Sequence, residues 1–589
     1  MQKTGIPERT KSRRIRFPSC ALLLRQLNMK KLFFALVVFG LVACARPIAP
    51  EGGPKDNIPP KVVPEKSTPN LRTRFTERSF NLTFDEWVTL QDAGTQVLVS
   101  PPLAKRPEIT LKGRTVTFKF DPDEVLRPNT TYTINFGTAV KDLHEGNAAK
   151  DLRFVFSTGD VIDSLSVTGI IVEAFSGEPQ ENISVQLYDT FDDSIAIKER
   201  PYYVARSDKS GQYAIPNVRA GRFKVIAIED ADQNMKWDGI NERIGFPDSL
   251  IQVNDSLSTI AAIRVFKPVP PLRLLSKNIG RYGFISLGYT RPPDTVPVHV
   301  DLPNLRWYHE TEQDSLLIWY DRPDSVAWEL IAGTDTVALR ALSRTAFLAT
   351  NTVNFADERQ ATPGGQTNRR GASSTPTPAG PQPPRTVNVR PTKPAEISFN
   401  TPLTQVDSAR CLLTVDSVAS NLFELTIDST RRRVLQLAID WRSEAKYTLT
   451  LLPGALTDFY GTSNADTLQR IFAVPAEKQL GSLSLSVENL TAETAYVLKL
   501  LRGGTTLESE QAFVADSTTM RFSFEKMDPI AFTVQVIEDQ NGNGQWDPGD
   551  YFKHRQPERV FTQKLDALRA NWEVEVTLNV AAGIRRRGE

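Results

Sequence analysis

The chain has 589 residues, a formal net charge of +1 and only three cysteines. The balanced charge excludes nucleic-acid binding driven by bulk positive charge. A single cysteine in the body of the chain, Cys411, excludes an intramolecular disulfide framework. The length predicts several domains.

Residues 1–43 combine an upstream extension with a secretory signal. From Met29 the chain has a short basic stretch, an apolar run over 32–42 and the small residue Ala43 just before Cys44. This is the order of a signal peptide. The apolar run, about a dozen residues, is too short to span a bilayer as a mature helix. We expect Met29 to be the true start; the alternative is one unusually long basic leader.

The segment 41–44, Leu-Val-Ala-Cys, resembles the lipobox of bacterial lipoproteins. The resemblance implies cleavage before Cys44 and acylation of that cysteine, for example with palmitate, so that a membrane becomes a partner. The alternative is an ordinary secretory signal with a chance cysteine. The Pro/Gly-rich residues 44–58 predict a flexible tether. Ala45 is not the aspartate of an inner-membrane retention signal, which favours the outer membrane. The missing acidic run after Cys44 favours its periplasmic face over the cell surface.

Beyond residue 58, apolar and polar residues alternate in short runs, which Gly, Pro, Asn and Asp interrupt at regular intervals. Such alternation predicts short strands in β-sandwiches. No later stretch has eighteen consecutive apolar residues, as a membrane-spanning helix would need. The predicted fold class is therefore all-β, a multidomain string of sandwiches.

The first predicted domain covers residues 59–159, with strands over 79–84, 96–100, 115–120, 131–136 and 153–157. It carries Pro59-Pro60, the strand Leu82-Thr83-Phe84-Asp85-Glu86, the turn from Pro128 to Tyr132 and the turn from Asp142 to Asn147. On these motifs it resembles the bacterial Ig-like domain of the S-layer SbsA type, as in Ig-like lipoproteins of Bacteroidota. The resemblance implies an Ig-like sandwich.

The second predicted domain, 160–268, has an Asp-Lys-Ser-Gly hairpin turn over 208–211 and a further turn at Ala220-Gly221. On these features it resembles the prealbumin-like sandwiches of the CnaB and carboxypeptidase-regulatory type. Residues 269–355 are β-rich but of unassigned type. Residues 356–394 have almost no large apolar side chains, which predicts a disordered linker.

The pattern then repeats. Residues 397–403 resemble 82–88 and residues 455–461 resemble 139–146, which predicts a second Ig-like domain over 395–477. A second prealbumin-like sandwich follows over 478–589. Such an array of domains is typical of an extended protein rather than of an enzyme with a catalytic pocket.

Two loops at equivalent places in the prealbumin-like domains have the alternating oxygen side chains of an EF-hand calcium loop. In the second loop, Gly544 lies at the sharp bend and Gln545 offers its backbone carbonyl. In the first loop, Met235 replaces that glycine, and Asn241 takes position 12 with Glu242 beside it. The candidate ligands are Asp539, Asn541, Asn543, Gln545, Asp547 and Asp550 in the second loop, and Asp230, Asp232, Asn234, Lys236 and Asp238 in the first. The alternative is a hydrogen-bonded Asx/Gly loop without metal. Trp237 and Trp546 recur in both loops and are expected to be packing anchors.

We expect a lipid-anchored, non-enzymatic envelope protein with a structural, adhesive or scaffolding role, whose partner is an envelope protein or glycan. None of the four histidines forms a zinc-type pair, and phosphate-cradling and nucleophile-elbow motifs are missing, so no catalytic residues and no organic cofactor are predicted. One alternative is a carbohydrate-binding accessory lipoprotein with a platform built from Trp307, Tyr308, Trp319 and Tyr320. These residues lie within predicted strands, which favours core packing over an exposed platform. A remote alternative is an envelope hydrolase, which would require a pocket of converging titratable groups.

Overall fold

The computed structural model describes residues 56–254, 257–300, 302, 305–322, 326–357, 384–390 and 392–580. Nearly all regular structure in these ranges is β-strand, arranged in many separate sheets, which confirms the all-β multidomain class. None of the described helices reaches the length and apolarity that crossing a membrane requires. We divide the described chain into five units, numbered in chain order.

Unit 1, residues 56–159, has a core rich in phenylalanine. The Phe80 ring stacks on Phe118, its partner on the neighbouring strand, and on Phe154 of another sheet, with centroids 4.9 and 3.8 Å away. The sheet orders are β1-β5-β4, β3-β6-β8 and β2-β7. The elements are η1 (Pro64–Lys66), β1 (Ser79–Thr83), β2 (Val88–Leu90), α2 (Ala93–Gln96), β3 (Leu98–Ser100), β4 (Glu108–Lys112), β5 (Thr115–Lys119), β6 (Thr131–Asn135), β7 (Val140–Asp142) and β8 (Arg153–Ser157).

Unit 2, residues 160–268, packs two sheets around buried aliphatic side chains such as Val167, Val185 and Ile215. The orders are β11-β10-β13-β14, with β15 also on β13, and β12-β9-β16, with β17 also on β9. The elements are β9 (Leu165–Glu173), β10 (Ser184–Tyr188), α3 (Ile195–Lys198), β11 (Tyr203–Arg206), β12 (Gln212–Val218), β13 (Gly221–Ile228), η2 (Gly239–Asn241), β14 (Ile244–Gly245), β15 (Ile251–Val253), β16 (Leu257–Thr259) and β17 (Ile263–Val265).

Unit 3, residues 269–351, has the sheet orders β18-β19-β22-β21 and β20-β23-β24. Its core includes Phe459 and Tyr460, which come from unit 4. The elements are β18 (Leu274–Arg281), β19 (Phe284–Tyr289), β20 (Val298–His299), β21 (Arg306–Glu312), β22 (Ser315–Asp321), β23 (Trp328–Ala332), β24 (Asp335–Leu339) and α4 (Arg344–Leu348).

Unit 4, residues 352–475, has the orders β26-β31-β30, β27-β33 and β25-β34-β32-β28-β29. Cys411 begins β28 and is buried, as expected of a core thiol, and burial raises its pKa to about 11. The elements are β25 (Thr386–Asn388), β26 (Ala395–Ser398), β27 (Leu403–Val406), η3 (Ser408–Arg410), β28 (Cys411–Val415), β29 (Val418–Ser420), β30 (Glu424–Ile427), β31 (Val434–Ala438), β32 (Lys446–Leu451), β33 (Leu456–Asp458) and β34 (Leu468–Ala473).

Unit 5, residues 476–580, has the orders β37-β36-β39-β40 and β38-β35-β41. The strand β41 pairs with β35 in parallel, as β16 and β17 pair with β9 in unit 2. The elements are η4 (Glu477–Gln479), β35 (Gly481–Glu488), β36 (Ala495–Arg502), β37 (Thr506–Val514), β38 (Thr519–Met527), β39 (Phe532–Asp539), β40 (Val560–Lys564) and β41 (Glu573–Asn579).

Strand order repeats along the chain. The three sheets of unit 1 recur in unit 4, with β25 and β29 added at the edges of one of them, and both sheets of unit 2 recur in unit 5. Unit 3 stands between the two pairs. The described chain is therefore a pair of β-units, an intervening sandwich, and a second pair that repeats the topologies of the first.

Two segments depart from the predicted ranges. Phe355, predicted to belong to the 269–355 domain, lies in the core of unit 4 and bridges to Phe399. The strand β25 lies inside the predicted disordered linker but pairs in parallel with β34. Arg390, just after it, pairs with Asp528 of unit 5 at 3.0 Å. The disorder prediction is thus wrong for 386–390, because composition alone does not show pairing with distant strands. Residues 358–383 lie outside the described residues.

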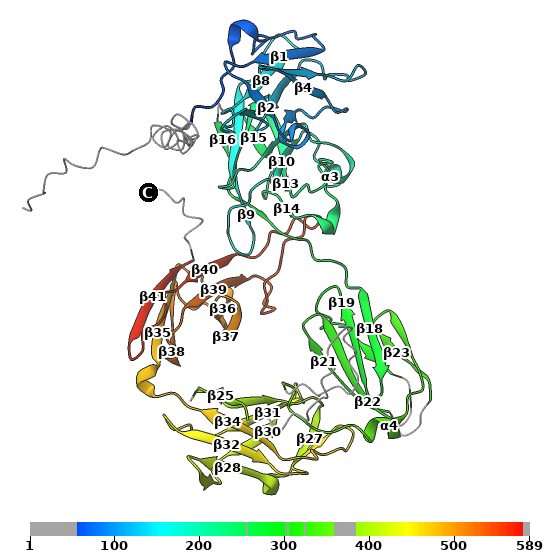
Figure 1. Cartoon of the computed structure of the whole chain (residues 1–589), viewed down its shortest axis with the longest axis vertical. Helices are drawn as coiled ribbons and strands as arrows, with labels where there is room; N and C mark the ends of the chain where they lie inside the picture. The colour runs from blue at the N-terminus through cyan, green and yellow to red at the C-terminus, as the bar shows by residue number, and fades with distance from the viewer. Residues whose placement is uncertain are drawn as a thin grey trace, which may run out of the picture.

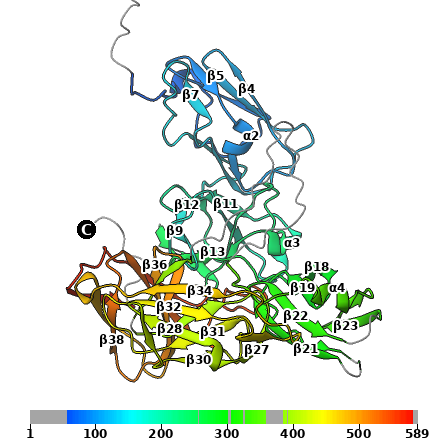
Figure 2. The same ribbon diagram turned by 60° about the horizontal axis from the view of Figure 1, so that its bottom comes forward.

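Units 2, 3, 4 and 5 form a closed circuit (Figure 1). Units 3 and 4 are joined by the ion pair of Glu310 with Arg433 at 2.6 Å, and units 4 and 5 by Arg390 with Asp528. Unit 5 returns to unit 2, where the Tyr551 and Trp237 rings lie 5.4 Å apart. Unit 1 stands outside this circuit, beside unit 2 (Figure 2); within the described ranges Arg200 of unit 2 donates to the carbonyl of Leu103 of unit 1 at 2.8 Å.

Candidate functional site

Equivalent loops leave equivalent strands in units 2 and 5. The strands β13 and β39 are both central in their sheets, and each runs into the acidic loop that the sequence singled out. We call residues 230–242 loop A and residues 539–558 loop B.

Loop A is closed by the carboxylate of Glu242. Its two oxygens accept hydrogen bonds from the backbone N–H groups of Ala231 and Asp238, at 3.1 and 3.0 Å. The Trp237 indole donates to the backbone carbonyl of Glu242 at 3.3 Å. Glu242 is therefore the residue that fixes both ends of this loop.

Loop B is closed by Glu558 in the same way. Its oxygens accept from the backbone of Gln540 and Asp547, at 2.8 and 2.9 Å, and the Trp546 indole donates to its carbonyl at 3.0 Å. Asp539 starts the loop and accepts from the backbone of Gly544 at 2.8 Å. In loop A, Asp230 accepts from the backbone of Met235 in the equivalent bond at 3.1 Å.

The two closing glutamates were not among the predicted ligands. Glu242 directly follows position 12 of the calcium-loop pattern, so the spacing could have identified it as a residue of the loop framework. Glu558 could not be found by spacing, because residues 548–557 separate it from Asp547, whereas only residues 239–241 separate Glu242 from Asp238. Aligning loop B with loop A through their tryptophans would have revealed it.

In loop A, Asp230, Asp232 and Glu242 each offer an oxygen within 4.8 Å of the other two. The Oδ1 atom of Asp230 is buried and lacks a hydrogen-bond donor. Asn234 donates to Asp232 and Asp238 at 2.8 and 3.3 Å. Carboxylate oxygens gathered in this way are the ligands that Ca²⁺ prefers, so loop A has the chemistry for a hard cation.

Loop B gathers its side chains differently. The amide groups of Asn541 and Asn543 donate to the Asp547 carboxylate at 2.6 and 2.7 Å, so these side chains are tied to one another. Asp550 lies beyond the loop framework, where it accepts from the backbone of Lys553 at 3.2 Å.

The candidate ligands Lys236 and Gln545 also differ in their hydrogen bonds. The side-chain ammonium of Lys236 donates to the carbonyl of Lys198 at 2.7 Å, which ties loop A to the end of α3. Gln545 is held in loop B through its backbone N–H, which donates to the Asn543 side chain at 2.7 Å.

The closing carboxylates are held in a setting that disfavours their charge. Burial raises the pKa of Glu242 and of Glu558 above the ordinary glutamate value, although backbone donors offset part of this effect. Burial also raises the pKa of Asp230, and the charge of Asp232 adds to it. A divalent cation in loop A would stabilise the ionised forms of Asp230, Asp232 and Glu242.

The sharp bend of both loops has a left-handed backbone. Gly544 has a φ of 76° and Met235, its equivalent, a φ of 62°. Glycine adopts this region without strain, whereas a side chain is disfavoured there. Gly544 therefore has the conformational role that the spacing predicts. In loop A, Met235 adopts the same left-handed backbone at a cost in conformational energy.

The additional residues of loop B, 548–557, fold into a small hairpin that we call the docking hairpin. Its backbone pairs Asp550 with Arg555 at 2.8 and 3.0 Å. Gly549 lies against the Phe266 ring of unit 2, where a Cβ atom would approach to 2.5 Å. Only glycine fits this contact without displacing the ring.

The docking hairpin joins unit 5 to unit 2. Tyr551 is buried among Trp237, Phe246 and other aromatic side chains of unit 2. Lys224 lies 5.2 Å from the centre of its ring, and Gln556 donates to the carbonyl of Phe246 at 2.8 Å. Trp546 in turn packs edge-on against Phe175 of unit 2, at 5.1 Å. Both loop tryptophans are thus anchors of this contact.

The aromatic platform expected for a carbohydrate-binding protein is not exposed. Trp319 and Tyr320 are buried. Tyr308 stacks on Trp319 and donates to the carbonyl of Thr430 at 2.6 Å, and Arg433 of unit 4 lies 5.2 Å from the Trp319 ring. Tyr320 packs against Tyr282 and Trp328 inside unit 3, and the half-buried Trp307 stacks on His309. The four rings therefore do not form one exposed platform, because Tyr308 and Trp319 lie in the contact between units 3 and 4 and Tyr320 lies in the core of unit 3.

A surface hollow of about 470 Å³ lies beside β40 and β41. Lys564, Asp566, Arg569, Trp572 and Glu573 contribute to its lining, which contains no serine, cysteine or histidine. The hollow therefore does not bring together a nucleophile and a histidine base of the serine-hydrolase type.

Solved structures with similar segments include pilins and an S-layer protein. The major pilin subunit BcpA of Bacillus cereus is 8% identical, with 70% of this chain and 98% of that chain covered and a TM-score of 0.13. The RrgB pilus protein from Streptococcus pneumoniae is 10% identical, with 72% and 66% covered and a TM-score of 0.15. The S-layer protein rSbsC is 9% identical, with 82% and 65% covered and a TM-score of 0.13. Such low TM-scores support no conclusion about this chain.

A search of curated proteins gave no match. A family model of the bacterial Ig-like domain matches residues 56–158, which are unit 1 almost from end to end. This match confirms the predicted resemblance: unit 1 is a bacterial Ig-like domain.

Proposed function

We propose that this protein is a lipid-anchored, non-enzymatic component of a bacterial cell envelope that acts as a structural, adhesive or interaction scaffold. The observation that carries the proposal is the bacterial Ig-like domain of unit 1, which follows the lipobox-like segment and tether of 41–58. The closed circuit of units 2 to 5 supports it, because a noncovalently closed ring of sandwiches presents a fixed outer surface.

The anchor itself is testable at Cys44, which lies outside the described residues. In cells fed an alkyne-tagged palmitate, the wild-type chain should take up label and sediment with outer membranes. Cys44→Ser should lose the label and become soluble in the envelope fraction. Equal labelling of both proteins would refute the anchor.

The side of the membrane is a second measurement. We propose the periplasmic face, so protease added to intact cells should leave the chain whole, and the same protease should cleave it after the outer membrane is permeabilised. Cleavage in intact cells would place it on the surface instead.

The partner is proposed by class, as an envelope protein or a glycan. Crosslinking in cells followed by mass spectrometry should recover one reproducible partner with the wild-type chain. If crosslinking recovers only abundant envelope proteins, and an unrelated lipoprotein recovers the same ones, a scaffold role is contradicted.

As a second function we propose calcium binding at loop A. The unpartnered Oδ1 of Asp230, together with Asp232 and Glu242, supports it. Calorimetric titration of the full chain with Ca²⁺ should show saturable heat, and Asp232→Asn should reduce it. The matched change Asn541→Asp in loop B tests whether a carboxylate there adds a second site. Heat that is absent at millimolar Ca²⁺ would refute the proposal.

A further inference from the structure

The two Ig-like units carry the same aspartate turn. In unit 4, Asp458 accepts backbone hydrogen bonds from Tyr460 and Thr462 at 2.9 and 2.8 Å. In unit 1, Asp142 accepts from Gly146 and Asn147 at 2.9 and 2.8 Å. The turns are equivalent within strand pairs β27-β33 and β2-β7 of identical topology.

The residue after each aspartate is also equivalent. The N–H of Phe459 donates to the carbonyl of Pro402 at 2.7 Å, and the N–H of Leu143 donates to the carbonyl of Trp87 at 3.0 Å. Leu143 therefore corresponds to Phe459, and Trp87 corresponds to Pro402.

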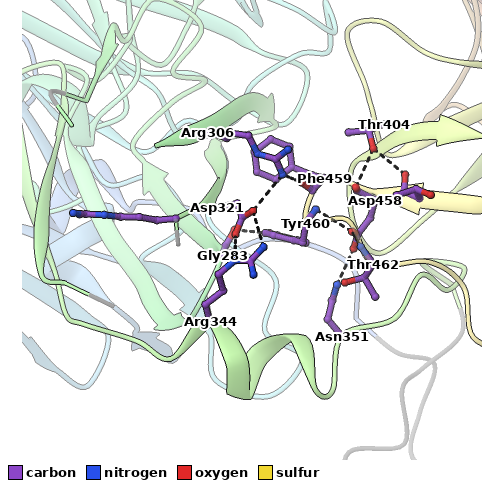
Figure 3. Close-up of polar contacts among 12 residues, drawn as sticks. Gly283, Arg306, Asp321, Arg344, Asn351, Thr404, Asp458, Phe459, Tyr460 and Thr462 are labelled. Atoms are coloured by element: carbon purple, nitrogen blue, oxygen red, sulfur yellow. Dashed lines mark hydrogen bonds and ion pairs between the residues drawn. The ribbon is translucent and has the colours of Figure 1, made fainter. Parts of the chain in front are cut away.

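Unit 3 covers the turn of unit 4 (Figure 3). The Tyr460 hydroxyl donates to the carbonyl of Gly283, and Arg306 donates to the carbonyl of Phe459. The Arg306 guanidinium also lies 5.1 Å from the centre of the Phe459 ring and pairs with Asp321 at 3.2 Å. Phe459 and Tyr460 are only 6% and 4% exposed as a result.

Covering changes the electrostatics of the turn. Burial under unit 3 raises the pKa of Asp458 above its ordinary value, although hydrogen bonds offset part of the effect. In unit 1, burial acts in the same direction on Asp142, but four backbone donors outweigh it and lower its pKa to about 2. One turn is built into an interface, and the other faces outward.

The turn of unit 1 leaves large apolar side chains uncovered. Trp87 and Leu143 are each 54% exposed, and Ile58 is 61% exposed. Trp87 rests on Gly113, where a Cβ would lie 3.5 Å from its ring, and Arg114 lies 6.0 Å from it. Ile58 lies on the entering chain, Trp87 directly precedes β2 and Leu143 directly follows β7, and we call these three exposed residues the tether face.

In both units the chain enters at this turn. The N–H of Asn354 donates to Asn400 at 2.9 Å in unit 4, and the N–H of Lys61 donates to Asp85 at 2.8 Å in unit 1. Just upstream, Asn351 donates to Asp458 at 2.7 Å. In unit 4, the covering module is therefore the part of the chain that immediately precedes it.

What precedes unit 1 is the tether. Asn147 of the turn donates to the carbonyl of Asp56 at 2.9 Å, so the tether leaves directly beside the tether face. From Asp56 to Cys44 is 12 residues, which extend to about 40 Å at most. The strand β7, which leads into the turn, lies at the end of unit 1 away from unit 2 (Figure 2).

We infer that the tether face docks on the interface of the lipid bilayer that carries the acyl chain of Cys44. The inference rests on the proposed anchor. Tryptophan and aliphatic side chains are favoured at the level of lipid headgroups, and a short tether keeps the face at high effective concentration beside the membrane.

The charges around the face select the lipid. Asp56, Asp85, Asp142 and Glu145 lie close enough to Glu86 to raise its pKa together with burial, and they outnumber the Arg114 guanidinium beside Trp87. These carboxylates repel an anionic surface. The face therefore fits net-neutral lipids, such as phosphatidylethanolamine and phosphatidylcholine, and not phosphatidylglycerol.

The test uses the full lipidated chain on phosphatidylethanolamine/phosphatidylcholine vesicles whose acyl chains carry bromine, a quencher of tryptophan fluorescence. Flotation first establishes that the chain is anchored. Quenching should then be present in the wild type, be lost in Trp87→Phe and persist in Trp572→Phe. Trp572 is 62% exposed but belongs to unit 5, so it is the matched control. Replacing half of the lipid by phosphatidylglycerol should reduce quenching at low salt.

The outcomes separate the two proposals. A chain that floats but shows no Trp87-dependent quenching retains its anchor and overturns the docking. A chain that does not float overturns the anchor and the docking with it. Protection of Trp87 from oxidative footprinting in cells, without quenching on vesicles, would assign the face to a protein resembling unit 3 and overturn the lipid assignment.

Discussion

Loops A and B have the same framework but differ in what lies between the tryptophan and the closing glutamate. Loop A turns back within residues 239–241, whereas loop B extends into the docking hairpin of 548–557. The insertion makes loop B an intramolecular interface, with Tyr551 buried in unit 2. Loop A keeps an unpartnered carboxylate oxygen on Asp230. Two sandwiches of the same topology thus use the same loop framework differently. Loop B forms a contact between units, and loop A forms a candidate cation site.

Removal of the Tyr551 side chain should have the largest effect, on the contact between units 5 and 2. Tyr551→Ala empties a buried aromatic site between units 5 and 2, at a cost of about 3–5 kcal/mol to their association. The circuit should open, and small-angle scattering should show a larger radius of gyration. Trp572→Ala is the matched control, because Trp572 is an aromatic residue of unit 5 that lies outside the docking hairpin and is 62% exposed. An equal effect of both variants would show that Tyr551 is not the anchor.

The closing glutamates come next. Glu242→Gln and Glu558→Gln keep the shape of the side chain but turn one of its two acceptors into a donor facing a backbone N–H. Each should cost about 1–3 kcal/mol and lower the melting temperature of its own unit, followed by differential scanning calorimetry. Glu310→Gln, at the contact between units 3 and 4, serves as a control outside the loops. If neither loop variant shifts melting, the loops are not closed by these carboxylates.

Calcium affinity should depend on pH in a defined direction. Ca²⁺ binds ionised carboxylates, and the pKa values of Asp230 and Glu242 are raised in the folded chain. Affinity should therefore weaken as the pH falls toward and through these raised values, and protons should be released on binding at mildly acidic pH. Calorimetry in buffers of different ionisation enthalpy measures that release. Affinity that stays constant as the pH is lowered from 7 to below the ordinary pKa of glutamate would contradict the assignment.

The smallest expected effect concerns the left-handed bend of the two loops. Met235→Gly relieves a left-handed side-chain position and should stabilise unit 2 by about 0.5–1 kcal/mol. Gly544→Ala should destabilise unit 5 by a similar amount. Chemical denaturation curves of the two variants measure the opposite signs. Effects of the same sign would show that the two bends are not equivalent.

Much of the fold could be predicted from local patterns. Alternating strands and the motifs from Pro59 to Asn147 identified unit 1, because these residues contact one another within the unit. The contacts that close the circuit could not be predicted, because Tyr551 and Trp237 lie in separate units and no local pattern links them. The contact of Trp319 and Tyr308 with unit 4 could not be predicted for the same reason, because Arg433 and Thr430 belong to another unit.

The loops show the same limit. Alternating oxygen residues correctly marked both turns, and the glycine position predicted the left-handed bend. Ranking the loops by sequence favoured loop B, since it has more ligand-type residues at the expected spacing. In the structure, Asn541 and Asn543 direct their amide groups to Asp547, and Asp550 belongs to the hairpin. Spacing gives the order of side chains along a loop, but not the partner to which each one is bound.

The closed circuit has a mechanical consequence. A pull between unit 1 and unit 4 would be shared by two parallel paths, one through unit 3 and one through unit 5. The path through unit 5 passes through the docking hairpin, a noncovalent link that can part and re-form without unfolding a sandwich. The path through unit 3 is covalent and would hold the ends together meanwhile. The docking hairpin thus acts as a reversible internal clasp, and the path through unit 3 keeps units 2 and 4 together while that clasp is open.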